Sequence, residues 1–224
     1  MVGLSTAAIS ILTSSQVRAL SPSDVSALTG SQIAAMTTDQ IGKLTTAQVA
    51  ALTGIEVAAM TTDQMKALGT AQVAAMSATQ IGALTTSQMS VLNTDQVGAL
   101  STKISAVKAT DVAAMTTDQV RSLSTAQVAA LTSGQTSALT TDQVQALSTD
   151  QVTSLSASGI SGLKTADVAA LTTDQLTHLK TSQLAALTAT QVTALTTDQV
   201  KSLNSSQLGA LVAAQVAALT TDQV

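Results

Sequence analysis

Apolar residues recur every eight positions along the chain. Leucine or methionine stands at each eighth residue from Leu4 to Leu100 and, after one short unit of seven residues, from Met115 to Leu219. We call each unit an octad and its Leu or Met the anchor, at position zero. Position five is also apolar in almost every octad, as at Val17 and Ile41. Including the short unit, 28 octads follow the consensus Leu-Thr-Thr-Asp-Gln-Val-Ala-Ala.

An eight-residue period restricts the secondary structure. In one long α-helix each octad would be rotated by about 80° from the last, so the anchors would never form a stripe. In one long strand, positions zero and five would face opposite sides. A β-solenoid of short strands is the more serious alternative, but the run Gln-Val-Ala-Ala-Leu favours helix over strand. The pattern therefore predicts one short helix per octad.

The polar positions mark where each helix begins. Thr or Ser at position one is followed three residues later by Gln, as in Thr140 and Gln143, which is the spacing of a capping box. Pro22 stands at position two, the first helical position, where proline is tolerated. Each helix is therefore expected to run from position two to about position eight.

The charges agree with these helix ends. All thirteen acidic residues stand at position three or four, and the basic residues, except Lys103, stand near the end of an octad or just after the next anchor. Acid at the start and base at the end of a helix is the distribution that the helix dipole favours. Pairs such as Asp63 and Lys66 are also i,i+3 neighbours that stabilise a helix slightly.

One octad buries too little apolar surface to offset the backbone entropy of ordering eight residues, so octads have to stack. The sequence thus predicts an all-α solenoid of very short helices, with residues 1–224 forming a single continuous octapeptide-repeat domain. Asp-Gln pairs recur at 24-residue spacing, as at Asp150, Asp174 and Asp198. This spacing fits three octads per coil, but a 24-residue duplication explains it equally well.

Three places depart from the pattern. The unit Leu100–Ala106 has seven residues and carries Lys103 and Ile104 in unusual positions, which indicates a one-residue deletion. Thr136 occupies the apolar position five and is expected to be a weak point. Gly159 and Gly162 predict a loosened turn.

Composition excludes most chemistry. The chain has no Cys, Phe, Trp or Tyr, so thiolate metal sites and aromatic stacking surfaces are absent, and nine scattered basic residues form no nucleic-acid surface. His178, the only histidine, has no partners at catalytic or metal-binding spacing. Calcium is disfavoured because helix starts explain the Asp positions. We predict no catalytic, cofactor-binding or metal-binding residues, no cofactor and no enzyme activity.

The N-terminal segment lacks the features of a membrane or targeting sequence. Residues 1–20 have no positively charged start, and the apolar run Ala7–Leu12 is short and contains Ser10. No stretch approaches eighteen apolar residues. The sequence therefore predicts neither a classical signal peptide nor membrane insertion.

Octads such as Leu171-Thr-Thr-Asp-Gln-Leu resemble repeat arrays of very large bacterial secreted or surface proteins, often described as adhesin-like or haem-utilisation proteins. The resemblance implies an extracellular or cell-surface spacer, shaft or self-assembling fibre element. Its expected partners are other copies of the chain, end to end or laterally, or neighbouring repeats of a longer chain. The alternative is a binding module that presents rows of Thr, Ser and Gln to a protein, glycan or ice.

Overall fold

The computed structural model describes residues 5–224, and all regular secondary structure in that range is helical. The described residues form 26 α-helices and one 3-10 helix, each of five or six residues and each from one octad. They fall into two compact units, which divide between Ala114 and Met115. The predicted all-α solenoid of very short helices is confirmed, while the interpretation of the chain as one continuous domain stays a prediction.

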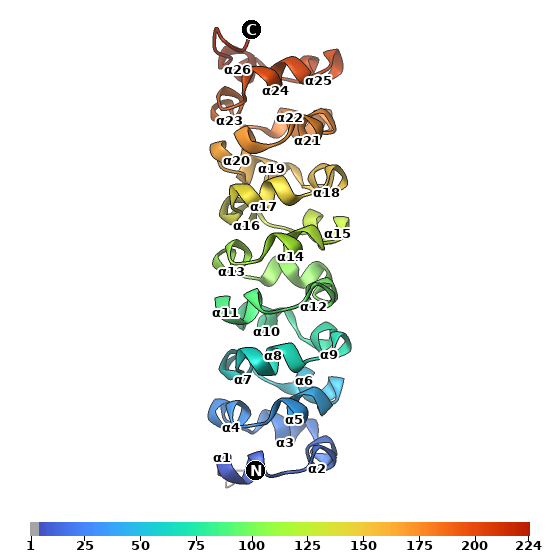
Figure 1. Cartoon of the computed structure of the whole chain (residues 1–224). Helices are drawn as coiled ribbons and strands as arrows, with labels where there is room; N and C mark the ends of the chain where they lie inside the picture. Colours follow the sequence, from blue (N-terminus) through green and yellow to red (C-terminus); the bar gives the residue numbers. More distant parts are fainter. Residues whose placement is uncertain (1–4) are drawn as a thin grey trace. The chain divides into compact units, whose positions relative to one another are not determined.

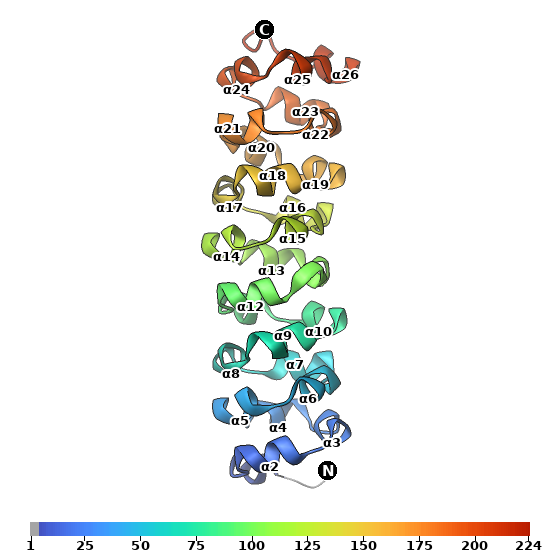
Figure 2. The same ribbon diagram turned by 90° about the vertical axis from the view of Figure 1, so that its right-hand side faces the viewer.

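The first unit holds α1 to α13 and the 3-10 helix η1 (Figures 1 and 2). Its helices are α1 (Thr6–Ser10), α2 (Ser14–Ala19), α3 (Pro22–Ser26), α4 (Gly30–Ala34), α5 (Thr38–Lys43), α6 (Thr46–Ala51), α7 (Gly54–Ala59), α8 (Thr62–Ala67), α9 (Thr70–Ala75), α10 (Ala78–Ala83), α11 (Thr86–Ser90), α12 (Thr94–Ala99), η1 (Ser101–Ala106) and α13 (Ala109–Ala113).

The second unit holds α14 to α26. Its helices are α14 (Thr117–Arg121), α15 (Thr125–Ala129), α16 (Ser133–Ala138), α17 (Thr141–Ala146), α18 (Thr149–Ser154), α19 (Ala157–Gly162), α20 (Thr165–Ala170), α21 (Thr173–Thr177), α22 (Thr181–Ala186), α23 (Ala189–Thr193), α24 (Thr197–Ser202), α25 (Ser205–Gly209) and α26 (Ala213–Ala217).

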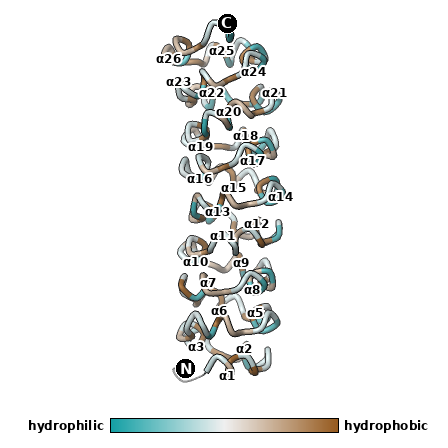
Figure 3. Tube along the Cα trace, turned by 60° about the vertical axis from the view of Figure 1, so that its left-hand side comes forward, coloured by the Kyte–Doolittle hydropathy of each residue, from teal (hydrophilic) through white to brown (hydrophobic). Residues whose placement is uncertain are grey.

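Each unit is built on two ladders of apolar side chains, one from the anchors and one from position five. Leu131 and Val128 are typical members and are almost completely buried. The methionine anchors, such as Met60, belong to the same core, as predicted. Leu4 lies outside the described residues. Hydrophobic and hydrophilic residues alternate along the trace of successive octads (Figure 3), because two positions in eight bring apolar side chains into the core and the others are mostly polar or small.

Helices stack at a fixed interval within each unit. Each helix packs on the helix three octads further along the chain, as α5 packs on α8 and α16 packs on α19. This interval agrees with the 24-residue spacing in the sequence. The Gln side chains described below reach the junction between the helices four and three octads back, directly before the helix on which their own helix packs.

The irregular places have specific structural causes. The seven-residue unit forms η1, whose first residue, Ser101, has a positive φ of 52°, and Ile104 takes the buried place of position five. The loosened turn expected at Gly159 and Gly162 is wrong, because both lie within α19. At Gly162 a Cβ atom would lie 2.6 Å from the Ser133 carbonyl oxygen, so the glycine permits close packing of α19 on α16.

Thr136 is buried in the core, as its position in the octad requires. Its hydroxyl donates to the Ser133 carbonyl at 3.0 Å, within its own helix. The polar atom is therefore satisfied locally, and the site lacks only the volume of a larger apolar side chain.

Candidate functional site

The described residues contain no feature typical of an enzyme site. No pocket is present among them, and no three His, Cys, Asp or Glu side chains group as metal ligands. His178 is exposed at the end of α21, with Nδ1 2.7 Å from the Asp174 carbonyl oxygen. No described helix is long and apolar enough to cross a membrane. The recurring feature of both units is a set of polar contacts at the helix starts.

The first of these contacts is the predicted capping box. In α8 the Thr61 hydroxyl accepts from the Gln64 amide at 3.2 Å, and Gln64 Oε1 accepts from the Thr61 amide at 2.8 Å. The same pair of bonds begins α17, at Thr140 and Gln143. Two of the amides left without a partner at each helix start are satisfied in this way. The charges follow the predicted helix ends, although the Asp63–Lys66 ion pair at 3.3 Å is exposed and weak.

The second contact was not predicted and uses the other end of the same Gln side chain. Gln64 Nε2 donates to the Ile33 carbonyl at 2.8 Å and to the Met36 carbonyl at 2.7 Å. Ile33 lies in α4, four octads before Gln64, and Met36 is the anchor that follows α4. One buried amide group thus caps its own helix and ties it to the end of a helix in the preceding turn. We call the carbonyl of the anchor that receives this bond the anchor carbonyl.

This inter-turn bond recurs in both units. Gln48 donates to the Leu20 carbonyl at 2.8 Å, and Gln191 donates to the Leu163 carbonyl at 2.7 Å. Each such bond contributes about 1 kcal/mol net, and each would leave a buried carbonyl without a donor if the amide were removed. The Gln side chains are nearly all buried, so they form no exposed row for a partner.

The seven-residue unit replaces the Gln amide with an ammonium group. Lys103 Nζ donates to the Ala74 carbonyl at 2.6 Å and to the Met76 carbonyl at 2.7 Å. Met76 is the anchor that follows α9, the helix four octads earlier, and its carbonyl is the group that a Gln side chain would reach. Lys103 breaks the charge pattern of the sequence because it serves as the inter-turn donor rather than as a charge at a helix end.

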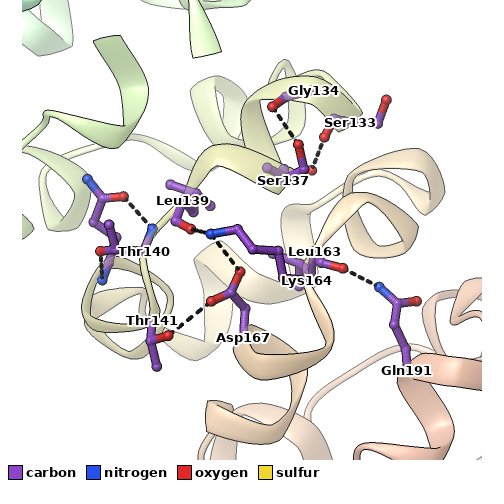
Figure 4. A network of polar contacts seen from close by, with 12 residues as sticks. Ser133, Gly134, Ser137, Leu139, Thr140, Thr141, Leu163, Lys164, Asp167 and Gln191 are labelled. Atoms are coloured by element: carbon purple, nitrogen blue, oxygen red, sulfur yellow. Dashed lines mark hydrogen bonds and ion pairs between the residues drawn. The ribbon is translucent and has the colours of Figure 1, made fainter. Parts of the chain in front are cut away.

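Two other octads supply the ammonium from position one. Lys164 Nζ donates to the Leu139 anchor carbonyl at 2.7 Å and lies 3.8 Å from Asp167 Oδ2, while the Thr141 hydroxyl donates to Asp167 Oδ1 at 3.1 Å (Figure 4). Asp167 stands at position four and is 1% exposed. Its carboxylate cannot donate to a carbonyl, and Lys164 provides the missing donor.

The first unit contains the same arrangement. Lys108 Nζ donates to the Leu84 anchor carbonyl at 2.6 Å and lies 3.7 Å from the buried Asp111 carboxylate. The Thr86 hydroxyl donates to Asp111 Oδ1 at 2.7 Å. Neither Asp oxygen that faces a Lys has a hydrogen-bond partner, so the ammonium balances it through charge alone.

The sequence held a signal for the inter-turn bond. A capping box accepts Glu as readily as Gln at this position. Position four nevertheless holds Gln in 21 of 28 octads and Glu only once, at Glu56. A requirement for an amide donor explains that bias, and a requirement for a cap alone does not.

A family model described as the ALTTAQ repeat matches residues 22–54, 57–92, 69–102, 104–141 and 173–205. These stretches cover about two thirds of the chain and both units. No curated protein matches the sequence.

Proposed function

This chain belongs to the ALTTAQ repeat family, and from that premise we propose that it is a non-enzymatic structural element: a spacer or shaft, or a self-assembling fibre element, of a bacterial surface or secreted protein. The observation that carries the proposal is the inter-turn bond. The same buried amide, aimed at the same anchor carbonyl, recurs from turn to turn in each unit. A repeat of this kind adds length without adding a new kind of contact.

The composition of the buried polar groups supports a structural role. Almost every buried polar side chain is committed to a cap or to a bond between turns. The alternative, a binding module with rows of Thr, Ser and Gln, loses its Gln rows to this burial. Its Thr and Ser residues at position one already accept hydrogen bonds from helix starts.

Self-association is supported by the two ends of the described region. At α25 and α26, the position-five residues Leu208 and Val216 are 41% and 51% exposed, whereas their equivalents in earlier octads are buried, and Val212 at position one of α26 is 48% exposed. At the other end Gln16 caps α2 through Oε1 and is exposed. Another copy of the chain, or neighbouring repeats of the same kind, could cover these exposed apolar residues.

Electron microscopy and solution scattering of the purified chain test this proposal. A shaft gives particles whose radius of gyration clearly exceeds the value of about 17 Å expected for a compact protein of this length. Self-assembly gives a further increase with concentration, which Val212→Lys and Val216→Lys should suppress without altering the circular dichroism spectrum. Compact particles that stay monodisperse at every concentration would contradict both forms of the proposal.

A further inference from the structure

Two octads carry a buried acidic side chain that hydrogen bonds satisfy only in part. Among the described residues, the only buried side-chain atoms without a hydrogen-bond partner are Asp111 Oδ2 and Asp167 Oδ2, one in each unit. Asp167 is 1% exposed, receives one hydrogen bond at Oδ1 from Thr141, and has the Lys164 ammonium 3.8 Å from Oδ2. We call the octads of Asp111 and Asp167, in which a lysine stands at position one, the lysine–aspartate octads.

The octad of α22 is a matched comparison within the second unit, because it also has a lysine at position one. There Gln183 Oε1 accepts from the Lys180 amide at 3.0 Å, and Nε2 donates to the Leu155 carbonyl at 2.9 Å. One side chain thus caps α22 and binds it to the preceding turn. α20 begins without a side-chain cap or a capping box, and its bond to the anchor carbonyl comes from Lys164. α13, the helix of Asp111, begins in the same way.

These differences lower the free energy that is needed to open a lysine–aspartate octad locally. A helix start without a side-chain cap is less stable, and a buried ion pair offsets its lost hydration only when hydrogen bonds satisfy the remaining oxygens. The Lys164 side chain is 50% exposed, so water weakens its attraction for Asp167. The next octad, with Thr172 as cap and Gln175 at position four, has neither defect. Local opening of a folded protein begins where such contacts are fewest.

We propose that the lysine–aspartate octads are the opening points of the two units. In the second unit α20 separates from α17 and α23, the helices on which it packs, while the other octads remain folded. The Leu139 anchor carbonyl loses its ammonium donor in the same step. In the first unit α13 separates from α11. In an array of identical octads only the ends would differ in stability, whereas these octads add opening points away from the ends of the chain.

Limited proteolysis by trypsin compares the two kinds of octad directly, because Lys164 and Lys180 occupy the same position. Cleavage within the stack requires local opening, so the cleavage rate after each lysine reports how often its octad opens. Rates are divided by those of synthetic peptides of the same sequence, which removes the preference of trypsin for flanking residues. We expect the corrected rate after Lys164 to exceed the rate after Lys180 by about tenfold, the effect of a lost cap and a weakened inter-turn contact.

Asp167→Gln is the test variant, because it keeps the trypsin site at Lys164 and copies the arrangement of Lys180 with Gln183. The corrected rate after Lys164 should fall to the rate after Lys180, which should itself stay unchanged. Asp174→Gln is the matched control, because it removes an exposed acid from the next helix. It should leave both rates as they are in the wild type.

A second pair of changes adds an opening point elsewhere. The octad of α9 differs from the octad of α20 only at Gly69 and Gln72, and Thr46 stands where Thr141 stands. Gly69→Lys combined with Gln72→Asp therefore builds a third lysine–aspartate octad, in the first unit. Hydrogen exchange measured by mass spectrometry should show the α9 amides exchanging about tenfold faster than in the wild type, with the α20 amides unchanged.

Three results would overturn the proposal. One is equal corrected cleavage after Lys164 and Lys180 in the wild type. Another is an Asp167→Gln chain in which cleavage after Lys164 is as fast as before. The third is an α9 double variant, folded by circular dichroism, whose α9 amides exchange no faster than those of the wild type. None of these results depends on whether the chain forms shafts or fibres.

Discussion

The regular octads of α5 to α8 and the irregular segment of η1 and α13 use different side chains to donate a hydrogen bond to the anchor carbonyl. In the regular octads a Gln amide reaches the anchor carbonyl, as at Gln64 and Met36. In the irregular segment Lys103 and Lys108 reach the anchor carbonyls of Met76 and Leu84. The comparison shows that either an amide or an ammonium group can serve as the donor to the anchor carbonyl, so this contact depends neither on a particular side chain nor on a fixed octad length.

The largest predicted effect concerns what the two regions share, the apolar ladder. Leu131→Ala should lower the free energy of unfolding by about 2–5 kcal/mol, because the anchor is buried and its loss leaves a cavity. Leu100→Ala, at the junction with η1, should lower the free energy of unfolding by a similar amount, because Leu100 is equally buried. Urea denaturation followed by circular dichroism measures both. A loss below about 1 kcal/mol at Leu131 would contradict an inward-facing anchor.

The next prediction tests the equivalence of ammonium and amide donors. Lys103→Met should lower the free energy of unfolding by about 1–2 kcal/mol, because it keeps the apolar stem and removes the donor to the Ala74 and Met76 carbonyls. Lys103→Gln restores an amide donor and should recover most of the loss. Denaturation together with hydrogen exchange of the α9 amides measures the effect. Equal stability of the Met and Gln variants would show that the ammonium contributes nothing.

A smaller effect is expected at the caps. Thr140→Ala should lower the free energy of unfolding by about 0.5–2 kcal/mol, because the Gln143 amide loses the hydroxyl that accepts its hydrogen bond. Thr140→Ser is the matched control and should retain most of the stability. The chain contains a natural counterpart, since α9 begins at Gly69 without a side-chain cap. Gly69→Ser should therefore stabilise the chain. If both Gly69→Ser and Thr140→Ala left the free energy of unfolding unchanged, the side-chain caps would contribute nothing to stability.

The smallest effect is electrostatic and local to α3. Hydrogen bonds from the Ser21 side chain and backbone lower the pKa of Asp24. A depressed folded-state pKa means that the stabilisation is present above the ordinary pKa of Asp and is lost as the pH falls through the lowered value. Side-chain carboxyl titration by nuclear magnetic resonance measures it. Ser21→Ala should raise the Asp24 pKa towards its ordinary value, and an unchanged pKa would exclude Ser21 as the cause.

The sequence predicted the parts of this fold that depend on local chemistry. Thr and Gln at fixed spacing locate each helix start, and the anchor and position five identify the core, because both patterns are read within one octad. The number of octads per turn could not be settled in the same way, since it depends on contacts between residues about 30 apart. The second function of Gln escaped prediction for the same reason, and so did the role of Lys103. Gly162 was misjudged because a lone glycine gives no indication of which neighbour approaches it.

The offset between packing and hydrogen bonding has a consequence for how the chain tolerates breaks. Each helix packs on the helix three octads away, but its Gln side chain is hydrogen-bonded to the end of the helix four octads away. Two separate sets of contacts therefore join the same pair of turns. A protease that cuts a single exposed junction, such as the one after Arg121, severs the covalent path while both of these contacts remain. Damage of this kind should leave the fragments bound to each other, and only several cuts within one turn would release a piece.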